Sequence, residues 1–135
     1  MRERQRFLTG FTLIELIMVL ILVGILVSIA VPAYRKAVLS SEGRAAVANL
    51  RAIHAAEKVI ELETNAYAAC GSAAACNTAL RIDIPADTAY SYSVNTGGGN
   101  FTARATRVAP GDNCTYTITN SDTKPSSSPQ CVYEQ

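Results

Sequence analysis

The sequence has little of what enzymes and nucleic-acid-binding proteins need. It contains a single histidine, His54, and the surrounding HAAEK lacks the second histidine of the HExxH zinc motif. The formal charge is +1 over 135 residues, which favours neither a nucleic-acid surface nor an acidic substrate. Residues 126–128 are three serines with no base beside them, and the Gly-rich segment 95–100 does not open a helix that would hold a phosphate. We therefore expect a protein that is not an enzyme and that binds neither a cofactor nor a metal.

Charge is also missing from a long stretch near the N-terminus. Residues 16–27, LIMVLILVGILV, are uncharged and almost wholly aliphatic, and the apolar segment spans 11–33 if Glu15 is tolerated. About 20 such residues are enough to cross a bilayer as a helix. Residues 1–10 precede this segment and form a short basic leader. The pattern predicts that the chain meets a membrane at its N-terminus.

The helical pattern continues beyond this apolar segment. Pro32 removes a backbone donor and Gly24 lowers helix propensity, so we expect a kink or loosening near Ser28–Ile29. One helix is predicted from about residue 12 to residue 64. In its second half, apolar residues recur at spacings of three and four, the mark of one buried stripe. These residues are Ala46, Leu50, Ile53, Ala56 and Ile60.

The C-terminal half carries the pattern of a small antiparallel sheet. Residues 65–88 are Ala-rich and predict a loop with a short helix. Alternating polar and apolar residues then predict strands, separated by turns and followed by loop residues 120–130. The expected strands are 89–94, 101–108 and 114–119, with turns at 95–100 and 110–112. The fold class is α+β, with the amphipathic half of the helix on a three- or four-stranded sheet.

The four cysteines, Cys70, Cys76, Cys114 and Cys131, all follow the apolar segment. An even number in this position indicates two disulfides in an oxidising compartment. Zinc is the weaker alternative, because five residues separate the first two cysteines. Pairing of Cys70 with Cys76 and of Cys114 with Cys131 is favoured, although the sequence leaves the other two connectivities open.

The remaining polar and aromatic residues are expected to have ordinary structural roles. We expect His54 to be on the surface or partly packed, and the acidic residues on the helix flank to form a solvated face. Asp112 and Asp122 are expected in turns rather than in a calcium site. The flank residues are Glu57, Glu61 and Glu63, and the expected core and sheet aromatics are Tyr67, Tyr90, Tyr92, Phe101, Tyr116 and Tyr133.

The most specific pattern is GFTLIEL at residues 10–16. A secretory signal peptide is cleaved after its apolar stretch, whereas a cut between Gly10 and Phe11 retains that stretch. A carboxylate inside a membrane helix costs about 2.5–3.5 kcal/mol on insertion scales, so Glu15 needs a partner. The cut would create a cationic amine on Phe11, one helical turn away. Glu15 can pair with this amine in its own subunit or in a neighbouring one, and the second pairing would also set the register of assembly.

On these residues the chain resembles the type IV pilin family, which includes the pseudopilins of type II secretion. The matching positions are Gly10 to Glu15, the aliphatic run, Gly24, Pro32 and Tyr34. The resemblance implies a type IV pilin fold whose disulfide-bounded C-terminal loop faces outward. It implies that a prepilin peptidase recognises Gly10 and methylates the new Phe11 terminus, and that Glu15 acts in assembly. It also implies local melting of the helix around Gly24 and Pro32 as subunits assemble.

The implied function is a structural subunit of a type IV pilus, used for adhesion, twitching motility or DNA uptake. The implied organisation is a leader (1–10), a transmembrane and filament-core segment (11–33) and a globular domain (34–135) that is periplasmic before assembly and extracellular after it. The implied partners are copies of the chain, the prepilin peptidase, an inner-membrane assembly platform and, before assembly, the inner membrane, with no specific nucleic acid.

Two alternatives remain open at this stage. A type II secretion pseudopilin shares the N-terminal motif, but the C-terminal cysteine pair and the lack of a dense acidic cluster argue against it. Residues 28–30, Ser-Ile-Ala, resemble an ordinary signal-peptidase site, which would release a disulfide-bonded binding domain starting at Val31. That alternative leaves Glu15 and the motif around it unexplained.

Overall fold

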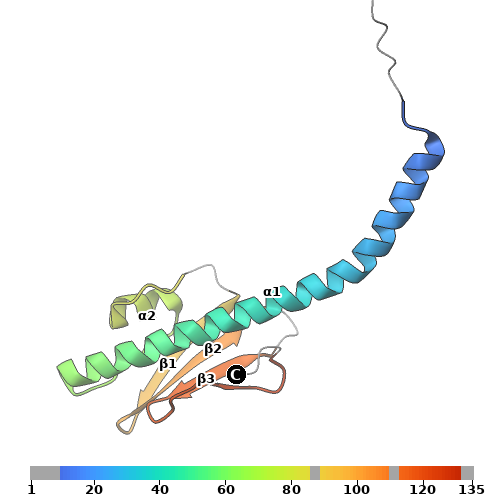
Figure 1. Ribbon diagram of the computed structural model, residues 1–135. Coiled ribbons are helices and arrows are strands. Elements are labelled where there is room, and N and C mark those ends of the chain that lie inside the picture. The colour runs from blue at the N-terminus through green and yellow to red at the C-terminus, as the bar shows by residue number, and fades with distance from the viewer. Residues whose placement is uncertain (1–9, 86–88, 110–112, 132–135) are drawn as a thin grey trace, which may run out of the picture. The chain divides into compact units, whose positions relative to one another are not determined.

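The computed structural model describes residues 10–85, 89–109 and 113–131. Its elements are two helices followed by four strands. Figure 1 labels both helices and strands β1 to β3. The chain divides into two units, Met1–Lys36 and Ala37–Gln135. The elements are α1 (Leu13–Thr64), α2 (Ala73–Leu80), β1 (Tyr90–Gly97), β2 (Asn100–Arg107), β3 (Thr115–Thr119) and β4 (Ser126–Ser127).

Helix α1 confirms the predicted long helix to within a residue at its start. It ends at Thr64, whose hydroxyl donates to the carbonyl of Ile60, and Asn65 follows in a left-handed conformation with φ of 57°. That conformation is a common way for a helix to end. The helix continues through Gly24 and Pro32, so the weakened stretch around residue 28 does not interrupt it.

The second unit is built around the amphipathic half of α1. Ala46, Leu50 and Ile53 are fully buried, which confirms the predicted stripe over these turns. Ala56 and Ile60 are only partly buried, because the stripe drifts around the helix toward its end. Its last buried position is Glu57 instead.

The burial of Glu57 corrects the expectation that it belongs to a solvated face. Its side chain is 0% exposed, whereas Glu61 and Glu63, on the same helix, remain accessible to solvent. Glu57 stands four residues after Ile53 and seven after Leu50, so the helical period places it on the core side. Position on the helix therefore decided its burial, despite its charge.

The four strands form one antiparallel sheet in the order β1-β2-β3-β4. In β1, Tyr90, Tyr92 and Val94 alternate on the buried face, as their spacing predicts. The same face continues through β2 and β3, and α1 lies across it (Figure 1). The buried residues of those two strands are Phe101, Ala103, Ala105, Tyr116 and Ile118.

The hairpin between β1 and β2 is tighter than expected. The strands stay paired until Gly97 faces Asn100, so only Gly98 and Gly99 form the turn, where a six-residue turn at 95–100 was predicted. These two glycines have φ values of 60° and 74°. Two consecutive positive values are what a two-residue turn needs to match the twist of its strands. Glycine at both positions therefore lets the strands extend to the turn.

A second correction concerns residues 120–130, which were predicted as loop. Ser126 and Ser127 form the short edge strand β4, pairing with Thr117 and Tyr116 of β3. Two polar residues carry no readable alternation, so only their pairing across the sheet reveals the strand. The predicted turn at 110–112 lies outside the described residues.

Both disulfides have the favoured pairing. Cys70 is bonded to Cys76 with Cα atoms 5.1 Å apart, and Cys114 to Cys131 with Cα atoms 4.7 Å apart. The first disulfide joins the segment before α2 to Cys76 within α2. The N-cap of this helix is Ser72, whose side chain accepts a hydrogen bond from the backbone nitrogen of Ala75. The second joins the start of β3 to the segment after β4. The structure is thus an α+β fold with a disulfide-bounded C-terminal loop.

Candidate assembly site on the N-terminal helix

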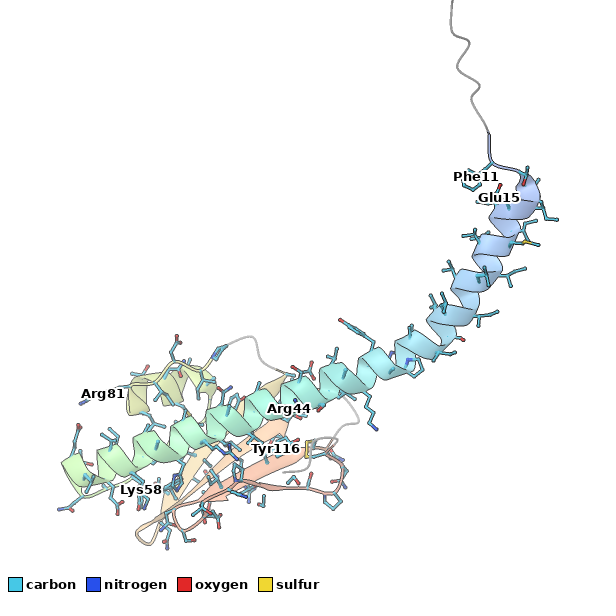
Figure 2. The ribbon with its side chains drawn as sticks, viewed as in Figure 1. Phe11, Glu15, Arg44, Lys58, Arg81 and Tyr116 are labelled. Atoms are coloured by element: carbon cyan, nitrogen blue, oxygen red, sulfur yellow. A yellow bond between two sulfur atoms is a disulfide. The ribbon has the colours of Figure 1, made fainter. Side chains whose placement is uncertain are left out.

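The start of α1 brings two residues of the GFTLIEL motif into contact. The backbone nitrogen of Glu15 donates to the Thr12 hydroxyl oxygen at 3.3 Å, and that hydroxyl lies 3.5 Å from the Glu15 carboxylate. Figure 2 shows Glu15 close to Phe11 at the start of the helix. A threonine followed three residues later by a glutamate is the sequence signature of a capping box at a helix start, and the structure shows the bond in which the threonine hydroxyl caps the helix. The spacing was readable in the sequence. Glu15 therefore has a local role in addition to any role between subunits.

The apolar side chains that follow have no cover. Phe11 is 80% exposed and Leu13 is 75% exposed, and the same holds along the helix as far as Tyr34. An 18-residue window in this helix has a mean hydropathy of 3.0, with none of it buried. Burying one large aliphatic side chain is worth about 1.5–3 kcal/mol. The first unit thus presents an apolar helix suited, by length and composition, to a membrane anchor or a signal sequence.

Glu15 is the one ionisable side chain between Phe11 and Ala33. Over the residues that the structure describes, the ion pairs join other residues and leave Glu15 without a cationic partner. The Glu15 side chain is exposed to solvent, and its carboxylate contacts the Thr12 hydroxyl.

Gly24 and Pro32 lie in the same exposed helix. A Cβ atom added at Gly24 would meet nothing within 4 Å, so packing inside this chain does not require glycine there. Pro32 cannot donate to the carbonyl four residues earlier, that of Ser28. The Ser28 hydroxyl donates to the carbonyl of Ile25 at 2.7 Å. The structure brings no second element to this stretch within the first unit.

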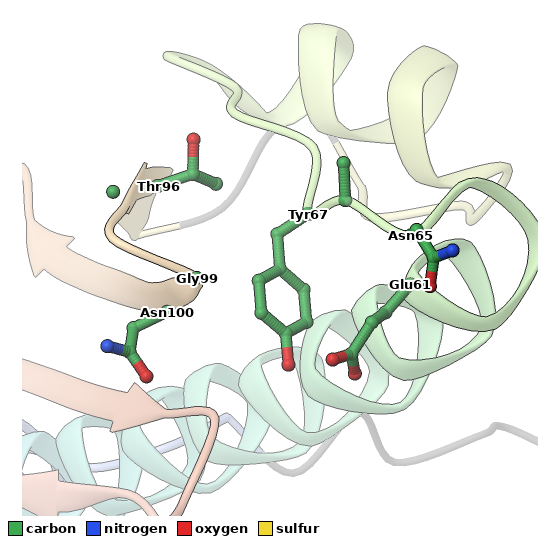
Figure 3. Close-up of a pocket in the computed structure, with 8 residues that line it drawn as sticks. Glu61, Asn65, Tyr67, Thr96, Gly99 and Asn100 are labelled. Atoms are coloured by element: carbon green, nitrogen blue, oxygen red, sulfur yellow. The ribbon is translucent and has the colours of Figure 1, made fainter.

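A separate hollow lies in the second unit, where the end of α1 meets the β1–β2 turn (Figure 3). Its volume is about 320 Å³, and Tyr67 stands between Glu61 and Asn100. The Tyr67 hydroxyl accepts a hydrogen bond from Lys58 at 3.1 Å, and its ring packs edge-on against Phe101. Contacts inside the chain thus hold both the hydroxyl and the ring of Tyr67. The lining residues are Glu61, Asn65, Ala66, Tyr67, Thr96, Gly97, Gly99 and Asn100.

The candidate calcium ligand that the structure describes, Asp122, is a turn residue, as expected. Its carboxylate accepts hydrogen bonds from the hydroxyl and the backbone nitrogen of Thr119 at 2.7 and 2.9 Å. These bonds, the hydroxyl contact first, lower the pKa of Asp122 below its ordinary value. Asp112 lies outside the described residues. Within the ranges that the structure describes, no three His, Cys, Asp or Glu side chains gather as a metal site would require.

His54 is partly packed, within the expected range. Its ring lies 5.6 Å from that of Phe101, and its Nε2 atom is buried without a hydrogen-bond partner among the described residues. The aromatic residues Tyr90, Tyr92 and Tyr116 are core residues, as predicted. Tyr133 lies outside the described residues.

No protein-family model matches the chain, and neither do any curated protein or solved structure. The class of fold therefore rests on the structure itself. The N-terminal half of the long helix α1 is apolar, and its second half packs on a four-stranded antiparallel sheet. A disulfide bounds the C-terminal segment. This is a pilin-like arrangement.

Proposed function

We propose that this chain is a structural subunit of a type IV pilus. In this proposal a prepilin peptidase cuts between Gly10 and Phe11, and the subunit polymerises through residues 11–33. The observation that carries the proposal is the uncovered apolar helix, which is continuous with the core helix of a separately packed domain. A helix of this kind needs a water-free surrounding, and both a bilayer and a bundle of identical helices supply one.

The position of the helix cap supports the proposed cleavage site. Thr12 caps α1, so the helix starts at Leu13, three residues after Gly10, and the whole apolar segment lies on the retained side of the cut. Cleavage after Ala30 would instead fall inside α1 and discard Glu15. Retention of the capped helix is therefore the simpler account of residues 10–16.

Glu15 supplies the contact that sets the assembly register. In the filament its carboxylate pairs with the methylated amine of Phe11 on a neighbouring subunit, so that both charges are neutralised in an apolar bundle. Removing one partner of a buried pair typically costs about 3–5 kcal/mol. A subunit at the wrong height would leave both charges unpaired, which disfavours every register but one.

The partners of the proposed subunit are those that the resemblance to type IV pilins implies. They are copies of the chain, the prepilin peptidase, an inner-membrane assembly platform and the inner membrane that holds the subunit before assembly. The globular domain then faces the periplasm and, after assembly, the exterior, where disulfides are stable. Filaments of this kind serve adhesion, twitching motility or DNA uptake.

The proposal is tested by the N-terminus and the intact mass of the protein in filaments sheared from cells, under non-reducing conditions. We expect a methylated Phe11 terminus and a mass lower by four hydrogens, two for each disulfide. A start at Val31, or recovery only as a soluble monomer, would overturn it. A methylated terminus on a chain found only in short periplasmic assemblies would assign it to the pseudopilins instead.

A further inference from the structure

The carboxyl group of Glu57 is buried in the core of the second unit. Its side chain is 0% exposed, and Oε2 accepts a hydrogen bond from the backbone nitrogen of Ala68 at 2.9 Å. The other oxygen, Oε1, is buried and has no hydrogen-bond partner within the described residues. A carboxylate needs donors at both oxygens, so the ionised group is only half satisfied here.

Ala68 belongs to the segment 65–70, which connects α1 to the first disulfide. The far end of this segment is held by Cys70, whose backbone exchanges two hydrogen bonds with Val94 of β1, at 3.0 and 2.7 Å. In its middle, Tyr67 packs on Phe101 with ring centroids 4.9 Å apart.

Helix α1 holds the backbone of this segment near the start of the segment as well. The nitrogen of Asn65 donates to the carbonyl of Glu61, and the hydroxyl of Thr64 donates to the carbonyl of Ala66. Glu57 is the contact from α1 to the backbone farther along the segment, at Ala68.

We propose that Glu57 is a pH-dependent latch: its protonated form keeps segment 65–70 closed on α1, and its ionisation releases the segment. Protonation at Oε1 leaves Oε2 free to accept from Ala68, so the neutral group keeps the latch contact. Ionisation places a charge at a buried oxygen that has no donor, and opening the segment lets water reach it. This proposal is independent of the proposed assembly function.

The direction of the effect follows from the burial of the group. Burial raises the pKa of Glu57 above its ordinary value of 4.5, and the weaker opposing influence is the Ala68 hydrogen bond. An acid whose pKa is raised in the closed state favours closure at low pH. That stabilisation is lost as the pH rises from 4.5 through the raised value. The latch therefore closes in acid and loosens toward neutral and alkaline pH.

The titratable groups around Glu57 have partners or positions of their own. On α1, Lys58 bonds to Tyr67 and pairs with Glu61 at 3.5 Å. His54 lies one turn before Glu57 and packs on Phe101. From the sheet side, Asp122 is bonded to Thr119 and is influenced by the charge of His54. His54 is the histidine in this set and lies on the same helix as Glu57, so a variant at this position serves as a control.

Opening of the segment would also change the hollow next to it. Asn65, Ala66 and Tyr67 line the cavity of about 320 Å³ shown in Figure 3, together with the β1–β2 turn. Ala68 follows these residues directly, so its release removes one of the contacts that hold this wall, while Tyr67 keeps its own contacts to Lys58 and Phe101. The latch thus couples the ionisation of one buried carboxyl group to the shape of a surface hollow.

The test is amide hydrogen exchange of Ala68 in the full chain, held in detergent micelles, from pH 4.5 to pH 8. After correction for the intrinsic exchange rate, we expect protection to fall by up to about tenfold per pH unit above 4.5 and then to level off at the raised pKa. Glu57→Gln keeps an acceptor for Ala68 without a charge, and should give protection that does not vary with pH.

Three further variants make the outcome decisive. Glu57→Met removes both the acceptor and the charge, so Ala68 should be weakly protected at every pH. This variant still tests the proposal if Glu57→Gln does not fold. His54→Gln and Asp122→Asn should keep the pH dependence of the original chain. Constant protection in the original chain, or the same pH dependence in Glu57→Gln, would overturn the latch. Loss of the dependence in His54→Gln would do so as well, because it would assign the titration to the histidine.

Discussion

At the scale of single residues, Glu15 has one role that the structure shows and a second that we propose. Its backbone nitrogen and carboxylate both contact the Thr12 hydroxyl, which is a helix cap within one subunit. In the proposed filament its charge, alone in the segment 11–33, pairs with a cation of a neighbouring subunit. A cap needs a polar side chain at this position, whereas an intersubunit ion pair needs a negative charge.

This difference predicts opposite results for two variants. Glu15→Gln keeps a side chain suited to the capping box and loses the charge, so we expect filaments to be lost while the helix persists. Thr12→Ala loses the cap, at a cost of about 0.5–2 kcal/mol, and keeps the charge, so filaments should still form. The measurement is the yield of sheared filaments, with the amount of processed subunit in the membrane as the control.

The reverse pattern would assign Glu15 to capping. If Glu15→Gln assembled normally and Thr12→Ala did not, no buried charge pair would be needed to set the register. A defect in processing would be seen separately, as a chain that still starts before Phe11.

At the scale of elements, the β1–β2 hairpin depends on backbone conformation more than on side-chain packing. Gly98 and Gly99 have positive φ values, and a Cβ atom at either would meet nothing within 4 Å. Space is therefore available for a larger side chain at both positions. It is the left-handed backbone conformation that restricts which residue can replace either glycine. Gly97, the preceding residue, has the same open surroundings without a positive φ, which makes it a matched control.

We expect Gly98→Ala to destabilise the globular part by about 1–2 kcal/mol, the cost of placing an L-residue in the left-handed region. Gly97→Ala should be neutral or should stabilise slightly, because it restricts the unfolded chain. Gly98→Asn should be well tolerated, since asparagine adopts this conformation readily. Urea unfolding of the full chain in mild detergent, followed by near-ultraviolet circular dichroism, gives the free energies. Equal effects of the two alanine variants would contradict the role assigned to the turn.

At the scale of the whole molecule, the chain contains two units with different solvent requirements. The buried core runs from Ala46 to Cys131 and lies wholly within the second unit. The first unit contributes an apolar helix with none of its 18-residue window buried. The second unit therefore has what it needs to fold in water, and the first does not.

A chain starting at Ala37 should accordingly be a soluble monomer with both disulfides formed. We expect a defined near-ultraviolet spectrum and an intact mass lower by four hydrogens than the reduced chain, whereas the full chain should require detergent. Size-exclusion chromatography and non-reducing mass spectrometry measure both properties. Aggregation of the shortened chain, or lack of a near-ultraviolet signal, would show that residues 1–36 belong to the folded core.

Patterns of local origin were readable from the sequence. The bounds of α1, the buried stripe of Ala46, Leu50 and Ile53, and the alternation in β1 follow from periods of 3.6 and 2, which neighbouring residues express along the chain. The apolar segment at 11–33 was equally plain, because composition alone defines it. The capping-box signature of Thr12 and Glu15 was readable too and was overlooked.

Contacts between distant segments were settled by the tertiary structure. The sequence left three cysteine connectivities open, and the spatial approach of Cys114 to Cys131 closes that choice. Edge strand β4 is recognised by its pairing with β3, and its two serines form no pattern that predicts a strand. The burial of Glu57 was the largest departure, because the charge suggested solvent while the backbone of Ala68, eleven residues away, supplied the partner that allows burial. The sequence by itself determined where α1 and strands β1 to β3 lie, since their periods are local. The tertiary structure decided which polar groups the core encloses, since only packing brings their partners near.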